Sequence, residues 1–122
     1  MVFGTPTTAI FAHLDSIGFT VKYNNEIVKI GGPVTTEGIT LVGKDSSGKI
    51  EGKIIKKQEK IFIDFKREIK RGTSLVFKSD FRQDNEYIQS CYIDNRLGVW
   101  NCLELAKTLE NGIIVFSSWE EH

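Results

Sequence analysis

The chain has 122 residues, of which 40% are hydrophobic and 26% are charged, and its 16 basic and 16 acidic side chains give a formal net charge of zero. This length and composition are those of one ordinary globular domain, small for an independent enzyme. The balanced charge gives no reason to expect nucleic acid or a membrane surface as a partner, and no apolar stretch is long enough to span a bilayer. A cytoplasmic location is therefore the default expectation.

The first two thirds of the chain predict strands. "TAIFAH" and "IGFTVKY", within residues 8–23, are rich in β-branched and aromatic residues and are separated by "LDS". From about Asn24 to Glu86, turn residues recur at close intervals and no helical period is visible. The strands expected there are "EIVKI", "ITLVGK", "KIEGKIIKK", "KIFIDF" and "SLVFK". Such closely spaced short strands predict a small antiparallel β-barrel or sandwich.

The last part of the chain changes period again. "YIQSCYID" is strand-like, "NRLGVWNCLELAKTLENG" has mostly helical spacing of its apolar residues, and "IIVFSS" is a continuous apolar strand. This order predicts a βαβ unit whose sheet is covered on both faces. The predicted fold class is thus α/β with an inserted antiparallel β module. Residues 1–23 and 87–122 form a partial α/β domain, and residues 24–86 form the insert.

Two cysteines and five polar side chains require separate interpretation. Cys91 and Cys102 lie in apolar segments at a spacing that does not suit a metal site, so we expect reduced thiols in the core. The five polar residues follow predicted strands, at the carboxyl ends where functional groups of such sheets gather. They are His13, Asp15, Asp94, Glu120 and Glu121.

Taken singly, these residues have ordinary interpretations. Asp94 alone is better explained as a helix N-cap, His13 alone as a satisfied histidine, and Glu120 with Glu121 as a solvated strand end. Together, an imidazole and carboxylates at one rim are the ligand set of a divalent cation such as Zn, Co or Mn. Asp15, two residues after His13, is placed to orient the imidazole. Neighbouring Glu120 and Glu121 point different ways, so one can bind metal while the other faces a substrate.

Three segments resemble one enzyme family in the same order along the chain. "AHLDSIGF" resembles the "AH-x-D-E-hydrophobic-G" segment of the cytoplasmic dinuclear-metal aminopeptidases of the glutamyl, deblocking and tetrahedral type. "YIDNRLGVWNCLELAKTL" resembles their "DDR-x-G" segment with the helix after it, and "IVFSSWEEH" resembles their strand that ends in Glu-Glu. The β-rich zone corresponds to the small barrel which that family inserts into its catalytic domain. The resemblance covers nearly the whole chain and implies part of a zinc-peptidase-like catalytic domain plus this barrel.

The resemblance also implies roles for the five residues. His13 would ligate one metal, Glu121 the other, and Asp94 would bridge the two. Glu120 would be the general base for a water activated by two divalent ions, Zn, Co or Mn. Asp15 would not bind metal itself but would orient the His13 ring. The implied function is hydrolysis of the N-terminal residues of peptides by a homo-oligomeric enzyme.

The chain also departs from the family pattern. Asn95 stands where the family has the second Asp of "DDR", Ser16 stands where it has Glu, and the role of His122 is open. The family has two further ligands, an Asp and a His, beyond its Glu-Glu pair, so we expect this chain to be a fragment that is inactive alone. Two other readings remain: a non-catalytic β-barrel module for oligomerisation or binding, and a small mononuclear metal-binding protein.

Overall fold

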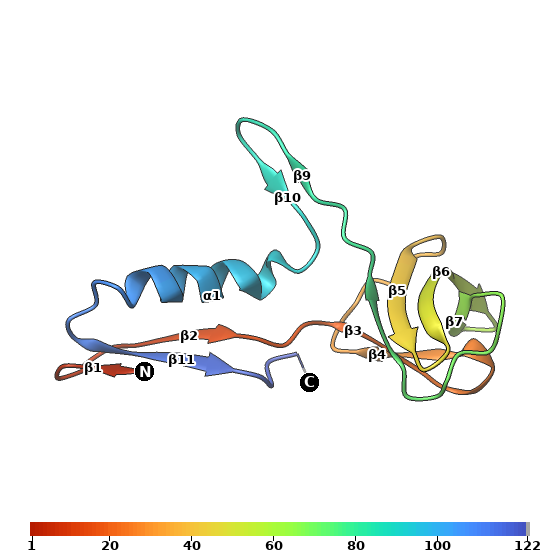
Figure 1. Ribbon diagram of the computed structural model, residues 1–122, viewed down its shortest axis with the longest axis horizontal. Coiled ribbons are helices and arrows are strands. Elements are labelled where there is room, and N and C mark those ends of the chain that lie inside the picture. The colour runs from red at the N-terminus through yellow and green to blue at the C-terminus, as the bar shows by residue number, and fades with distance from the viewer. Residues whose placement is uncertain (122) are drawn as a thin grey trace. The chain divides into compact units, whose positions relative to one another are not determined.

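The computed structural model describes residues 1–121, which fall into two compact units (Figure 1). One unit is continuous and comprises residues 17–80. The other combines residues 1–16 with the segment from residue 81 onward. His122, whose role the sequence leaves open, lies outside the described residues.

The continuous unit is a six-stranded antiparallel sheet that almost closes into a barrel. Its strand order is β4-β3-β8-β5-β6-β7. The strands are β3 (Gly18–Val21), β4 (Ile27–Ile30), β5 (Thr40–Asp45), β6 (Gly48–Lys57), β7 (Lys60–Asp64) and β8 (Ser74–Phe77), with a short 3-10 turn, η1, at Tyr23–Asn25. A single bridge between Glu26 and Phe62 joins the two edges of the sheet. The expected antiparallel module is therefore confirmed, and its five expected strands are β4 to β8.

Alternation along the strands accounts for this barrel. In β6 the side chains of Ile50 and Ile54 are buried, whereas those of Lys49, Glu51 and Lys53, at the alternate positions, are exposed, as expected for a strand with one face on a core. One hydrophobic cluster fills the inside. Its buried members are Phe19, Val21, Ile27, Leu41, Ile50, Ile54, Ile63, Ile69 and Leu75.

One strand lies in a different sheet from the one expected. The sequence analysis groups "IGFTVKY" with the first strand, in residues 1–23. In the structure β3 pairs with β4 on one side and β8 on the other, inside the six-stranded sheet. The reason is burial: Phe19 and Val21 are wholly buried members of the barrel core. The barrel unit thus begins at Ile17 and ends at Asp80.

The second unit contains a three-stranded sheet of order β1-β11-β2. Its strands are β1 (Val2–Phe3), β2 (Ala9–His13) and β11 (Gly112–Ser117). β11 is parallel to β2, with Val115 opposite Phe11, and β1 is antiparallel to β11. The first and last parts of the chain therefore share a sheet, although about a hundred residues separate Phe11 from Val115. The short strand β1 has no counterpart in the sequence-based prediction.

Helix α1 (Ile93–Leu105) packs on one face of this sheet (Figure 1). The buried contact joins Ala12, Cys102 and Ile114, so Cys102 is a core thiol as expected. On the other face Phe11 is 67% exposed. The prediction that both faces are covered is therefore wrong for the residues that the structure describes.

The strand expected before the helix is also different. Within "YIQSCYID" only β10 (Ile88–Gln89) is a strand, and it pairs with β9 (Arg82–Gln83) in a separate hairpin. The chain turns at Tyr92, whose φ is 65°, and the helix starts at the next residue. The parallel strands beside the helix are therefore β2 and β11, and the barrel is inserted between β2 and α1. No helix among residues 1–121 has the length and apolar character of a membrane span.

Candidate functional site

The candidate site begins with His13, the last residue of β2. Its register partner is Ser117, the last residue of β11, and the N–H of Leu14 donates to the carbonyl of Ser117 at 2.7 Å. Two parallel strands therefore end side by side at this rim, as the sequence predicts. The His13 side chain is 7% exposed.

The two ring nitrogens of His13 face different partners. Nδ1 lies 3.1 Å from the carbonyl oxygen of Asp15, which can only accept, so Nδ1 carries the hydrogen. Nε2 lies 3.0 Å from Oδ1 of Asp94 and 3.8 Å from a carboxylate oxygen of Glu120. In the neutral ring this Nε2 holds a lone pair directed at carboxylates. A cation, either a proton or a metal ion, must therefore lie between Nε2 and these oxygens.

The surroundings of His13 raise its pKa. Burial of the ring alone lowers the pKa because it disfavours the charged form. The hydrogen bonds to Asp94 and to the carbonyl of Asp15, with the negative charges of Glu120 and Asp94, outweigh burial and raise the pKa of His13 above its usual value. These neighbours therefore favour the charged form of the His13 ring more than water does.

Asp94 reaches the site from the first turn of α1. Its backbone is not helical, and the peptide bond to Asn95 is cis. The N-cap position belongs to Tyr92, and the Asp94 side chain, 86% exposed, contacts His13. The interpretation of Asp94 as an N-cap is therefore wrong.

Glu120 and Glu121 follow β11, and Asp15 fixes the second of them. The backbone N–H of Glu121 donates to Oδ2 of Asp15 at 2.9 Å. One ligand atom from each of His13, Glu120 and Glu121 lies within 4.8 Å of the other two. This triple differs from the predicted ligand set, because Glu120 takes the place given to Asp94.

The structure thus brings all five predicted side chains to one rim. Three of them, His13, Asp94 and Glu120, line an open depression of about 300 Å³. Its lining consists of Phe11, Ala12, His13, Asp94, Asn95, Ser117 and Glu120. The sequence analysis missed Ser117, although its place opposite His13 follows from ending both strands at the same rim. It also missed Arg96, which donates to Oγ of Ser16 at 3.1 Å and so joins the start of α1 to the segment that follows β2.

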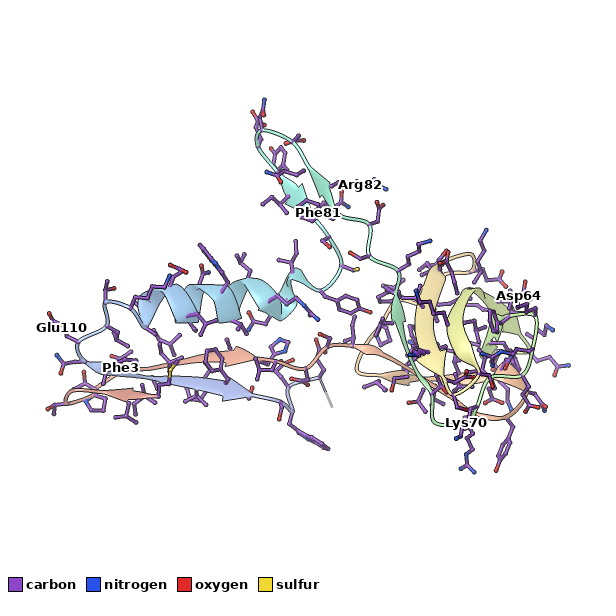
Figure 2. The ribbon with its side chains drawn as sticks, viewed as in Figure 1. Phe3, Asp64, Lys70, Phe81, Arg82 and Glu110 are labelled. Atoms are coloured by element: carbon purple, nitrogen blue, oxygen red, sulfur yellow. The ribbon has the colours of Figure 1, made fainter. Side chains whose placement is uncertain are left out.

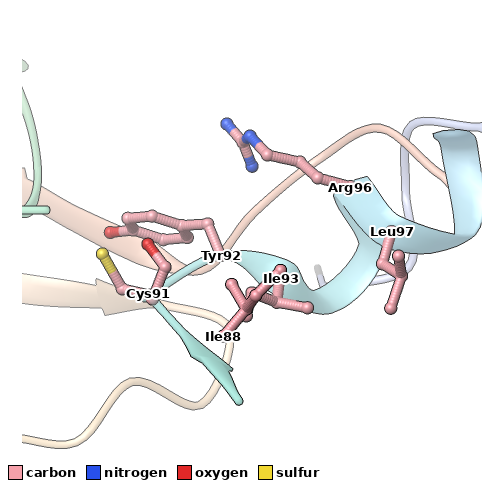
Figure 3. Close-up of a pocket in the computed structure, with 7 residues that line it drawn as sticks. Ile88, Cys91, Tyr92, Ile93, Arg96 and Leu97 are labelled. Carbon is pink, nitrogen blue, oxygen red and sulfur yellow. The ribbon is translucent and has the colours of Figure 1, made fainter. Parts of the chain in front are cut away.

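A larger depression in the same unit is chemically different. It measures about 410 Å³ and lies where β10 meets α1 (Figure 3). Its lining is mostly apolar and consists of Ile88, Ser90, Cys91, Tyr92, Ile93, Arg96 and Leu97. None of the carboxylates around His13 contributes to it. Size alone therefore does not identify the reactive site, and the charged rim is the better candidate.

Comparison with known proteins shows what fold this is. No family model matches the sequence, and no curated protein does. Solved structures of a peptidase do match. Pyrococcus horikoshii TET1 peptidase, described as able to assemble into a tetrahedron or a large octahedral shell, aligns with a TM-score of 0.72 and 21% identity over 95% of this chain and 46% of its own. The dodecamer of PhTET1-12s aligns with a TM-score of 0.70 and 22% identity over 94% and 44%.

These matches define a class of fold. The chain has the fold of a part of a tetrahedral peptidase, with a β-barrel inserted between β2 and α1. It spans less than half the length of the structures that it matches. At about 20% identity the likeness shows the fold, so the chemistry has to be argued from the residues at the rim.

Proposed function

We propose that this chain forms part of the active site of a metal-dependent aminopeptidase that hydrolyses the N-terminal residues of peptides. The observation that carries the proposal is the convergence on His13 Nε2 of carboxylates from two different elements, Asp94 from α1 and Glu120 after β11. Exposed carboxylates that gather by chance are common. The His13 ring, however, is nearly buried, its Nδ1 hydrogen is bonded to a carbonyl, and its Nε2 faces these carboxylates. Chance contact of solvated side chains does not explain this arrangement.

The donor set fits a divalent cation. One imidazole nitrogen and carboxylate oxygens suit Zn, Co or Mn better than a soft ion, which would prefer thiolates. His13 and Glu121 would be ligands, with Asp94 shared between two ions. When bound, such ions act as Lewis acids and lower the pKa of water. Asp15 holds the ring through its carbonyl and holds Glu121 through its carboxylate.

In this proposal Glu120 would be the general base. It is 60% exposed, lines the depression, and lies close enough to the cluster to accept a proton from a water that attacks a peptide carbonyl there. The matched TET1 peptidase assembles into shells, and we extend self-assembly to this protein as part of the proposal.

Metal titration by calorimetry tests this proposal. We expect Glu121→Gln to raise the dissociation constant for Zn, Co or Mn by roughly 10- to 100-fold, because a neutral amide is a poorer ligand. Glu120→Gln should retain metal but, in a complete peptidase, lower turnover of aminoacyl p-nitroanilides by about 10²- to 10⁴-fold. Glu110→Gln, an exposed glutamate of the same unit, is the matched control. Equal metal affinity in all three variants would refute the site.

A site for one cation is the second candidate. The triple of His13, Glu120 and Glu121 within 4.8 Å by itself suits a single ion. Stoichiometry separates the two functions: two ions per chain support the peptidase site, and one ion supports a mononuclear metal-binding protein. In the second case Glu120→Gln should weaken metal binding as much as Glu121→Gln does.

A further inference from the structure

The contact between Asp94 and His13 is not fixed by the helix that carries Asp94. The backbone angles φ and ψ are −80° and 111° at Asp94 and −116° and 35° at Asn95, so the regular part of α1 starts only after these two residues. The Asp94 side chain is 86% exposed, and packing therefore does not hold it in place. Holding such a side chain 3.0 Å from His13 costs conformational entropy, so another residue has to orient it.

Arg96, two residues after Asp94, contacts the chain on both sides of this pair. Its guanidinium donates to Oγ of Ser16 at 3.1 Å, three residues after His13. The same guanidinium lies 5.5 Å from the centre of the Tyr92 ring, two residues before Asp94 (Figure 3). One side chain thus joins the turn that leads into Asp94 to the segment that follows His13.

Arg96 also lies beside the His13 ring. The two residues line a second depression, of about 240 Å³, together with Leu14 and Val99. Asp94 does not line this space and belongs instead to the depression where the carboxylates gather. Arg96 therefore borders His13 from outside the proposed metal site, which is a suitable place for a residue that orients the site without binding metal.

We propose that Arg96 is a positioning residue of this site, which holds Asp94 in front of His13 Nε2 through its contacts with Tyr92 and Ser16. A guanidinium presents its donors in a rigid plane and can stack on an aromatic ring while it donates, so it can join two segments at once. It has no acceptor and does not lose its charge, so it cannot be a metal ligand itself. The inference rests on the proposed metal site and adds a residue that acts on this site through Asp94.

The sign of one substitution separates this role from a simple effect of charge. Arg96 is positive and lies near a proposed site for cations, so its charge alone weakens metal binding. If Arg96 had no positioning role, Arg96→Met would therefore bind metal more tightly. Loss of a residue that orients a metal ligand instead lowers affinity, typically by about 10- to 100-fold. Because the Ser16 contact is exposed, we expect Arg96→Met to raise the dissociation constant for Zn by roughly tenfold.

A double variant tests whether Arg96 acts through Asp94, with constants measured by calorimetry on the whole chain. Asp94→Asn should weaken Zn binding by itself, because an amide is a poorer ligand than a carboxylate. Arg96 then has no ligand to orient, so adding Arg96→Met to Asp94→Asn should not weaken binding by more than about threefold. With Co in place of Zn, the visible absorption band depends on the ligands of the ion, and Arg96→Met should change this band in the same way as Asp94→Asn.

The Ser16 end of the link gives an independent pair of variants. Ser16→Ala removes the acceptor but leaves the stacking on Tyr92, so it should weaken Zn binding less than Arg96→Met does. Ser16→Glu replaces one neutral acceptor by a carboxylate, which forms charge-assisted bonds with a guanidinium. It should lower the dissociation constant by about two- to fivefold in the parent, as for an exposed ion pair, and by less in the Arg96→Met chain.

Arg82→Met is the matched control. Arg82 is an exposed arginine of the β9–β10 hairpin in the same unit (Figure 2), and it lines neither of the two depressions that contain His13. Its removal changes the net charge as Arg96→Met does, and should alter the dissociation constant by less than about twofold because salt screens an exposed charge. Urea unfolding of the metal-free chains, followed by tryptophan fluorescence, shows whether a variant has also lost stability.

Several results would overturn the proposal. Tighter or unchanged Zn binding by Arg96→Met would do so and leave the metal site intact, and so would losses that simply add in the double variant. If Arg96→Met also lowers the urea midpoint, Ser16→Glu decides: a gain that depends on Arg96 supports the link, and an equal gain in both backgrounds, or none, refutes it. A parent chain that binds no Zn, Co or Mn would overturn this inference together with the proposed function.

Discussion

The Asp15 carboxylate contacts both Glu121 and the ring of His13. Removing this carboxylate therefore tests whether these contacts hold the site together. Oδ2 accepts the Glu121 N–H at 2.9 Å, Oδ1 lies 3.5 Å from Nδ1 of His13, and the side chain is only 10% exposed. We therefore expect Asp15→Ala to loosen Glu121 and the ring together, and to destabilise the α/β unit.

The magnitude follows from the type of bond. A hydrogen bond to a charged group contributes about 1.5–3 kcal/mol. Glu121 is half-buried, so water replaces part of the lost bond, and the lower half of this range, about 1.5–2 kcal/mol, is expected for Asp15→Ala. Asp15→Asn keeps an oxygen that can accept the Glu121 N–H and loses only the charge. Its cost should be about 1 kcal/mol.

Tryptophan fluorescence isolates the unit that contains the site. Both tryptophans of the chain, Trp100 and Trp119, belong to the α/β unit, and the barrel has none. Urea unfolding followed at this signal should rank the proteins as parent, Asp15→Asn and Asp15→Ala in order of falling stability. Glu110→Ala, at an exposed carboxylate of the same unit, should lie within about 0.5 kcal/mol of the parent. If Asp15→Ala also lies within that margin, the Asp15 contacts do not hold the site together.

Three further predictions concern the barrel and are measured by urea unfolding followed with far-UV circular dichroism. The Arg67 guanidinium, whose nitrogens lie 2.6 and 2.8 Å from the buried Asp45 carboxylate, holds the pKa of Asp45 well below its usual range. As pH falls, the carboxyl of Asp45 takes up a proton in the unfolded chain before it does so in the folded chain. The stabilisation from the Arg67 pair is therefore complete above the unfolded pKa of about 3.9 and is lost as the pH falls below it. Asp45→Asn should remove this loss of stability in acid, and a variant with the same pH profile as the parent would contradict the prediction. Ile54→Ala, at a fully buried site, should cost about 2–5 kcal/mol, and a cost below about 1 would mean that the barrel core is loosely packed. Gly43→Ala should cost about 1–3 kcal/mol, because its β-carbon would lie 2.7 Å from the carbonyl oxygen of Ser74, and a neutral result would show that the strands can separate.

The strands of the barrel could be predicted because their signal is local. Short runs such as "KIEGKIIKK" alternate between core and solvent and are bounded by turn residues, and each became a strand of the six-stranded sheet. Sheet membership could not be predicted in the same way. β2 and β3 have similar composition and lie four residues apart, but they pair with different strands. Pairing is decided by contacts distant in sequence, such as Phe19 with Leu75, which composition does not record.

The candidate site could be predicted because strand ends define it. His13 closes β2, and the two glutamates follow β11, so parallel pairing alone brings them to one rim. Asp94 reached the rim for a different reason from the one expected. The segment before it is a hairpin strand and a turn, and Asp94 itself sits in the distorted first turn of α1. The structure has Asp94 at the rim where the sequence predicts it, but the strand predicted directly before it is absent.

The net charge of the whole chain is a poor guide to its charged partners, because a partner interacts with the charges near its binding surface. A unit of 64 residues, such as the barrel, has a radius of gyration of about 11 Å, and salt at physiological strength screens charge over about 8 Å. The barrel unit, residues 17–80, holds 13 basic and 8 acidic side chains, a formal charge of +5, and the other unit holds 3 basic and 8 acidic side chains, a formal charge of −5. The inference from composition against anionic partners holds only if both signs are interspersed on each unit. The excess of five basic side chains in the barrel unit violates that condition, so the chain total alone does not exclude an anionic partner at that unit.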